Sequence, residues 1–183
     1  MSHLCVFHSS NTRQPVKLLN HHEDIVRELA SIGVLFEQRK LAAAVTADTT
    51  VDEALVAYQQ EADRLRELHG YVLLDVLQLD ESQPEKERVA QRAEMLAERV
   101  AGTWAWLLVA GRCLFQLRVG EQVFALMCEK GDLLVLPEGI RYWFDAGEHP
   151  RMTAIRLLTA ESGSAGKKTG EDPASQYPEF DDY

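Results

Sequence analysis

The hydrophobic period of the chain changes near residue 103, and this change constrains the fold more than any other feature. Before it, apolar residues recur at helical spacing, whereas after it apolar and polar residues alternate in short segments. Turn residues such as Gly120-Glu121 and Lys130-Gly131 separate these segments. Closely spaced strands joined by tight turns predict a small antiparallel barrel or jelly roll with helices packed outside. The six predicted strands are 103–109, 113–119, 122–128, 132–136, 140–145 and 152–159.

Three helices are predicted before residue 100, each at a recognisable start signal. Asn20 and Thr50 are each followed three residues later by Glu, which is the spacing of a capping box. Pro84 suits the first turn of a helix, where its missing N–H costs nothing. Residues 94–100 fit either the end of the third helix or a strand, and the sequence leaves this open. Segments 34–37 and 71–79 are predicted strands.

Composition supports one domain with a tail. The chain has 183 residues, of which 46% are hydrophobic, so it can bury a substantial core. We expect a single domain over 1–160, with a helix-rich part at 1–100 and a barrel core at 101–160. Residues 161–183 form an acidic C-terminal tail, which we expect to be flexible unless Tyr177 or Phe180 docks on the domain.

Charge and cysteine content exclude several classes of partner. There are 29 acidic against 19 basic residues, a net charge of −10, which disfavours nucleic acid and anionic lipid. No apolar run approaches the ~20 residues of a membrane helix, and the start of the chain lacks a signal peptide. The cysteines are odd in number and widely spaced, so we expect reduced thiols in a cytoplasmic protein.

One motif within the strand-rich part suggests a particular barrel. Gly131, Pro137, Gly139 and Tyr142 form the pattern G-x5-P-x-G-x2-Tyr. A strand, a tight turn that needs Pro and Gly, and a second strand would direct the last residue into the barrel. This pattern resembles the second cupin motif, which ends in a metal-binding His where this chain has Tyr142.

The surrounding sequence is similar to the acireductone dioxygenase family of the methionine salvage pathway. The similarity is clearest between 111 and 158, and it includes "VLFEQ", "VDEALVAYQQEADRLRELHGY" and "TGEDPASQYP". The resemblance implies a mostly β cupin jelly-roll barrel with about three peripheral helices. It also implies an Fe(II) or Ni(II) ion held by three His and one Glu, and the oxidation of an acireductone by O2.

The positions that match the family's ligands carry other residues here. Counting back from Gly111 in the family's first motif places two His ligands on Glu98 and Val100, and the Glu ligand on Trp104. The fourth ligand position is Tyr142. The family's arginine falls on Trp106. No histidine lies between residues 70 and 148, so no shift of the alignment restores a His pair.

The chemistry of these replacements led us to predict no metal cofactor. Valine has no lone pair and an indole N–H only donates. A phenol with a reference pKa of ~10 ligates poorly at neutral pH. The residues around this position, which we take as a candidate pocket, are Glu98, Trp104, Trp106, Arg141 and Tyr142. No catalytic residue is predicted.

Three functions remain compatible with the sequence. The first, which we prefer, is a catalytically degenerate family member with a binding or regulatory role. The second is a working acireductone dioxygenase with an unconventional site. The third is a metal-independent cupin that binds a small molecule through Glu98, Tyr142 and Arg141. A small-molecule ligand is the expected partner, and the sequence does not determine the oligomeric state.

Overall fold

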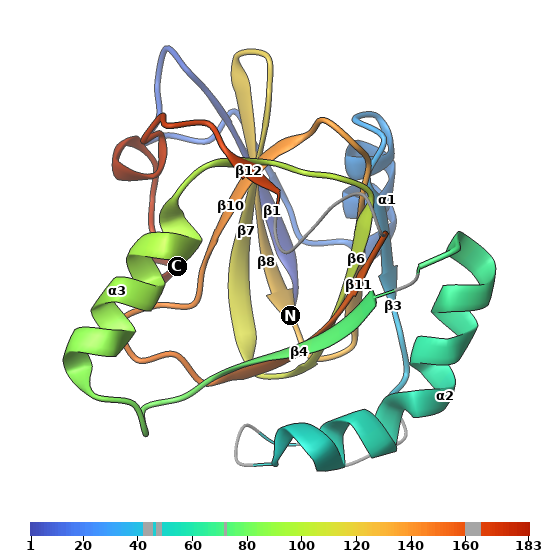
Figure 1. The fold of residues 1–183 in the computed structure, drawn as a ribbon. Coiled ribbons are helices and arrows are strands. Elements are labelled where there is room, and N and C mark those ends of the chain that lie inside the picture. Colours follow the sequence, from blue (N-terminus) through green and yellow to red (C-terminus); the bar gives the residue numbers. More distant parts are fainter. Residues whose placement is uncertain (42–45, 47–48, 72, 160–165) are drawn as a thin grey trace.

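Two antiparallel sheets packed face to face form the centre of the molecule (Figure 1). The computed structural model describes residues 1–41, 46, 49–71, 73–159 and 166–183. The first sheet has the strand order β12-β5-β10-β7-β8-β1-β2, and the second has the order β3-β9-β6-β11-β4. The predicted fold class, mostly β with three peripheral α-helices, is confirmed.

The strands of the first sheet are β1 (His3–His8), β2 (Lys17–Leu19), β5 (Arg99–Val100), β7 (Arg112–Val119), β8 (Gln122–Glu129), β10 (Arg141–Asp145) and β12 (Lys167–Lys168). Those of the second sheet are β3 (Leu35–Gln38), β4 (Leu73–Leu79), β6 (Trp104–Ala110), β9 (Asp132–Leu136) and β11 (Met152–Leu158). The helices are α1 (His22–Ala30), α2 (Val51–His69) and α3 (Glu85–Leu96), with 3-10 turns at η1 (Ala174–Gln176) and η2 (Phe180–Asp182).

The strands were predicted well in the part of the chain where turn residues separate short alternating segments. All six predicted strands are present as β6 to β11, with ends shifted by a few residues at most. The sequence analysis missed β1, which pairs antiparallel with β8 across six residues. Its alternation was present, because Leu4 and Val6 face the core between the sheets while Cys5 and Phe7 face the other side. Adding β1 and β2 completes one edge of the first sheet.

The helix starts were predicted with mixed success. The capping box of α2 is present, with Thr50 accepting from the backbone N–H of Glu53 and the Glu53 carboxylate accepting from the backbone N–H of Thr50. The predicted box at Asn20 is wrong, because α1 begins one residue later, at an N-cap His21 whose side chain makes no capping bond. Pro84 is the N-cap of α3 rather than a residue of its first turn.

The open question at residues 94–100 has a definite answer. Helix α3 ends at Leu96, and Arg99–Val100 form the short strand β5 between β10 and β12. Residues with high helix propensity extend the helix as far as Leu96. From Arg99 onward the backbone pairs with β10, and Arg99 lies opposite Tyr142.

The core has three parts, separated by the two sheets. The largest fills the space between the sheets and includes Trp106, Phe115 and Tyr142. A second lies between α2 and the outer side of the second sheet, with Tyr58 and Leu65 packed against β6 and β11. A third lies between the first sheet and the C-terminal segment.

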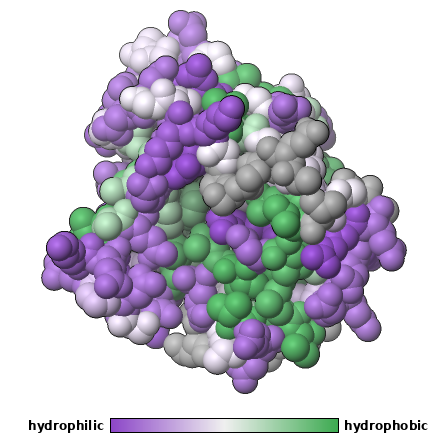
Figure 2. Space-filling view, viewed as in Figure 1, coloured by the Kyte–Doolittle hydropathy of each residue, from purple (hydrophilic) through white to green (hydrophobic). Residues whose placement is uncertain are grey.

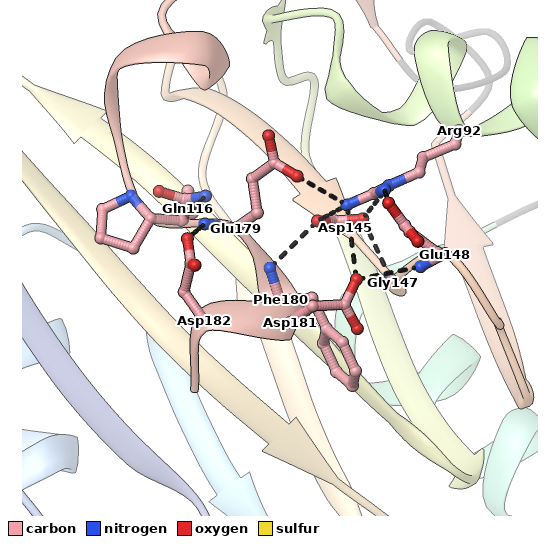
Figure 3. A network of polar contacts seen from close by, with 10 residues as sticks. Arg92, Gln116, Asp145, Gly147, Glu148, Glu179, Phe180, Asp181 and Asp182 are labelled. Carbon is pink, nitrogen blue, oxygen red and sulfur yellow. Dashed lines mark hydrogen bonds and ion pairs between the residues drawn. The ribbon is translucent and has the colours of Figure 1, made fainter.

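The C-terminal segment docks on the first sheet through a polar network (Figure 3). Asp145 at the end of β10 is fully buried and accepts two hydrogen bonds from Arg92 of α3, at 2.9 and 2.8 Å. It also accepts from the backbone N–H of Phe180, while Glu179 accepts from the same guanidinium at 2.9 Å. Tyr177 is buried as well. The tail from 166 onward is therefore ordered, and the predicted boundary at 160–161 lies outside the described residues.

Apolar side chains gather at the centre of one face of the molecule. Figure 2 places them in the region where Figure 1 draws β4 and β11, with hydrophilic surface on both sides. β4 is the edge strand of the second sheet, and its Leu73 is 47% exposed. Among the helices that the structure describes, none is both long and apolar enough to span a bilayer.

Candidate functional site

The five residues of the predicted pocket divide between the two sides of the first sheet. Tyr142 and Phe144 of β10 belong to the core between the sheets, whereas Trp143 between them belongs to the core under the C-terminal segment. Because successive strand residues point to opposite sides, Arg141 shares the outer side with Trp143. The structure therefore brings the two tryptophans to Tyr142 and keeps Arg141 apart from them.

Aromatic rings fill the space between the sheets at the predicted pocket. The Trp104 ring centroid lies 5.3 Å from that of Tyr142 and 5.8 Å from that of Trp106. Trp106 also packs edge-on against Phe115 at 5.0 Å, and its ring lies 5.2 Å from that of Phe144. Trp104, Trp106 and Tyr142 are 3%, 1% and 1% exposed. At these spacings the rings are in direct contact, so this part of the interior is packed core.

The environment of Tyr142 keeps its phenol protonated. Burial raises the pKa of Tyr142 to about 12, although the nearby Arg99 and Arg156 charges act in the opposite direction. At neutral pH the side chain therefore presents an O–H group rather than a phenolate. A protonated phenol is a poor metal ligand.

The indole nitrogens of the two tryptophans point to the same conclusion. The Nε1 atoms of Trp104 and Trp106 are buried and have no hydrogen-bond partner among the described residues. An indole N–H can donate a hydrogen bond but has no lone pair for a cation. The family's carboxylate and arginine positions thus carry groups that cannot coordinate a metal.

Glu98 is buried, but its carboxylate belongs to an ion-pair network on the outer side of the first sheet. Its side chain is fully buried, and its oxygens lie 2.6 and 2.9 Å from Nε and Nη2 of Arg118. Thr169 donates to the same carboxylate at 2.7 Å, and Arg141 lies 3.6 Å away. A carboxylate neutralised in this way is not free to bind a metal on the inner side.

Val100 completes the set of ligand positions and offers no donor atom. It lies opposite Arg141 in the pairing of β5 with β10, so it shares the outer side with Arg141. Within the described residues, no group of three or more His, Cys, Asp or Glu side chains is placed to hold a metal ion. The residues at the four positions that the resemblance assigns to the family's ligands do not fit Fe(II) or Ni(II) coordination.

Two facing antiparallel sheets with an N-terminal helical part and the Gly131–Tyr142 turn define a cupin-type protein. The ARD/ARD′ family profile matches residues 6–165, and the chain belongs to this family.

Named relatives match over the whole chain. The acireductone dioxygenase of Pseudomonas paraeruginosa (strain DSM 24068 / PA7) is 43% identical over 183 residues, covering 100% of both chains. That of Pseudomonas aeruginosa (strain UCBPP-PA14) is 42% identical with the same coverage. A solved structure described as acireductone dioxygenase from Bacillus anthracis with cadmium ion in active center has a TM-score of 0.74 and 20% identity. It covers 88% of this chain and 95% of that chain.

These comparisons contradict the prediction that no metal cofactor is involved. The relatives are acireductone dioxygenases, a metal-dependent class, and the Bacillus anthracis protein carries cadmium in its active centre. The prediction was wrong because it judged metal binding by the whole protein from the side chains at four aligned positions only.

Sequence reasoning missed the polar residues that organise the outer side of the first sheet. Arg118, Thr169 and Glu171 surround Glu98, although they are distant from it in sequence. A signal was available in Arg118, a charged residue near the end of a largely apolar strand. Its partners Glu98 and Glu171 lie 20 and 53 residues away along the chain, and local periodicity carries no information about such contacts.

Proposed function

We propose that this chain is a catalytically degenerate member of the ARD/ARD′ family with a binding or regulatory role. The observation that carries the proposal is the packing of Trp104 against both Tyr142 and Trp106, at 5.3 and 5.8 Å between ring centroids. An acireductone needs an open, polar space beside the reacting oxygen. Three contacting aromatic side chains occupy the place where the family's motif would provide it.

The direction of Glu98 supports the proposal. A general base or ligand must reach the reacting atoms, but the Glu98 carboxylate is paired with Arg118 on the outer side of the sheet. This pairing also argues against a metal-independent pocket formed by Glu98, Arg141 and Tyr142 together. Those groups lie on two sides of one sheet.

A second candidate is a working acireductone dioxygenase with an unconventional site. The observation that favours it is the 43% identity to a curated acireductone dioxygenase over the full length of both chains. Fold and ancestry are compatible with either candidate, because activity depends on the side chains of the site. The two candidates make opposite predictions in a single assay.

The assay measures oxygen consumption with an acireductone substrate and purified full-length protein. Fe(II) and Ni(II) are supplied separately, and the Pseudomonas aeruginosa relative is the positive control. We expect no consumption above the rate of the enzyme-free reaction with either metal. Consumption that scales with protein concentration and retained metal would overturn the proposal and establish the second candidate.

A single back-substitution provides the matched variant. We expect Trp104→Glu to leave oxygen consumption at the background rate, because Val100 still lacks a donor and Glu98 still faces Arg118. Thermal unfolding of the variant separates absence of activity from absence of fold. Turnover by the folded variant would contradict this expectation, since it would mean that Trp104 alone prevents activity and that Glu98 and Val100 do not.

We also infer a cytoplasmic location. The three cysteines are free and buried in the described structure, as expected where thiols stay reduced. The net charge of −10 supports a partner that is neither nucleic acid nor an anionic membrane.

A further inference from the structure

Two arginines lie side by side on the outer side of the first sheet. Arg118 of β7 is directly opposite Arg141 of β10 in the antiparallel pairing. Like charges at opposed positions repel unless anions compensate them. Glu98 and Glu171 supply the two compensating carboxylates.

The two carboxylates play different parts because their burial differs. Glu98 is fully buried and holds Arg118 through contacts of 2.6 and 2.9 Å, with Thr169 donating to it at 2.7 Å. It therefore fixes the Arg118 guanidinium in place. Removing Glu98 would leave a buried site without its anion, so it is a permanent part of the fold.

Glu171 is the exchangeable member of the cluster. Its carboxylate spans the arginine pair, 2.5 Å from Nη2 of Arg118 and 3.2 Å from Nη1 of Arg141, and its side chain is 54% exposed. The hydrogen bond from Arg118, followed by that from Arg141, lowers the pKa of Glu171, so it stays ionised at neutral pH. Exposed ion pairs of this kind are weak, and an external anion can replace them.

A groove of about 640 Å³ adjoins the arginine pair. Its lining combines Arg118, Arg141 and Glu171 with the apolar side chains of Ile32 and Ile140. Two guanidinium groups beside apolar surface suit a small organic molecule with a carboxylate at one end.

We propose that this groove is a binding site for a small carboxylate, and that Glu171 occupies the anion position as an internal competitor. The C-terminal segment then reports ligand binding, because the ligand displaces the contact between Glu171 and the sheet. This inference is independent of the proposed function, since the two arginines of the groove point to the opposite side of the sheet from Tyr142.

Acetate and propionate are the probes, titrated at constant ionic strength with chloride into the full-length protein. Binding is followed by NMR on the arginine side-chain Nε–H resonances, with inorganic phosphate titrated in a parallel experiment. We expect Glu171→Gln to bind acetate roughly two- to fivefold more tightly than the wild type, because the competitor is an exposed pair. Propionate should bind more tightly than acetate in the same variant.

Glu138→Gln is the matched control, because Glu138 also lines the groove but makes no described contact with either arginine. We expect it to bind acetate as the wild type does. Arg141→Gln, with its fold checked by thermal unfolding, should weaken acetate binding to the Glu171→Gln background by at least about fivefold.

Three results would overturn the proposal. Equal acetate affinity for Glu171→Gln and Glu138→Gln would exclude internal competition. Arg118 and Arg141 resonances that do not respond to any probe would exclude the site. Tighter binding of phosphate than of either carboxylate would exclude the ligand class. None of these results depends on whether the protein consumes oxygen.

Discussion

At the scale of single residues, the buried carboxylate of Asp132 makes the stability of the protein depend on pH. It is 1% exposed, and burial raises its pKa to about 6, although hydrogen bonds from Ser2 and the Glu129 N–H act in the opposite direction. The folded protein therefore binds a proton at Asp132 more readily than the unfolded chain does. Its contribution to stability is present below pH 4 and is lost as the pH rises to about 6.

We predict that Asp132→Asn removes this pH dependence. The difference in unfolding free energy between wild type and variant should change by up to about 3 kcal/mol between pH 4 and pH 7, in favour of the variant at the higher pH. Urea denaturation across this range measures it. A constant difference between the two proteins at every pH would show that Asp132 does not titrate in the folded state near pH 6.

At the scale of elements, the C-terminal segment depends on one arginine of α3. Arg92 binds the fully buried Asp145 with two hydrogen bonds, while Phe180 and Gly147 donate backbone N–H groups to the same carboxylate. Burial alone would raise the pKa of Asp145, but these hydrogen bonds and the Arg92 charge outweigh it and lower the pKa. This contribution to stability is therefore present at neutral pH and is lost as the pH falls into the acidic range.

We predict that Arg92→Gln destabilises the protein by about 3 kcal/mol and releases the C-terminal segment, because it leaves Asp145 buried without its cation. Limited proteolysis and hydrogen exchange over residues 173–183 measure the release. Arg88→Gln is the control, since Arg88 lies one turn earlier on α3 and makes no ion pair with the described residues. Equal protection of the segment in both variants would contradict the assignment.

The glycine turns before and after β7 are predicted to differ in their tolerance of a side chain. Gly111 and Gly120 both have positive φ, but a Cβ on Gly111 would lie 2.0 Å from the Arg151 carbonyl oxygen, whereas a Cβ on Gly120 would meet nothing within 4 Å. Gly120→Ala should cost about 1 kcal/mol from backbone strain alone. Gly111→Ala should cost at least about 3 kcal/mol, because backbone must also move. Similar thermal midpoints for the two variants would contradict this.

The sequence predicted elements well where a local signal exists. The Thr50 capping box and the turns between β6 and β11 are local, so pattern reasoning found them. That Glu98 and Val100 stand at the family's ligand positions stays a prediction, and the sequence did not indicate the side of the sheet to which they point. That direction depends on where α3 ends and β5 begins pairing, which is a tertiary effect.

At the scale of the whole molecule, the chain has the fold expected of its family, and aromatic side chains pack its interior. The aromatic cluster of Trp104, Trp106 and Tyr142 lies within the main core. The ion pairs of Arg118 and Arg141 lie outside this core. The family resemblance led to the expectation of packed tryptophans in place of ligands. The ion pairs of Arg118 and Arg141 could not be predicted from the sequence, because they join residues up to 53 positions apart along the chain.

Aromatic side chains fill the interior at the positions that the resemblance assigns to the active site. The measurement that tests it most directly is the unfolding free energy of Trp106→Ala, with the 78%-exposed Val56→Ala as the reference for an uninvolved position. If the core is packed around Trp106, the free energy of unfolding should fall by about 3–5 kcal/mol in Trp106→Ala and hardly at all in Val56→Ala. A loss below about 1 kcal/mol for Trp106→Ala would mean that its ring borders an open pocket, and the account would be wrong.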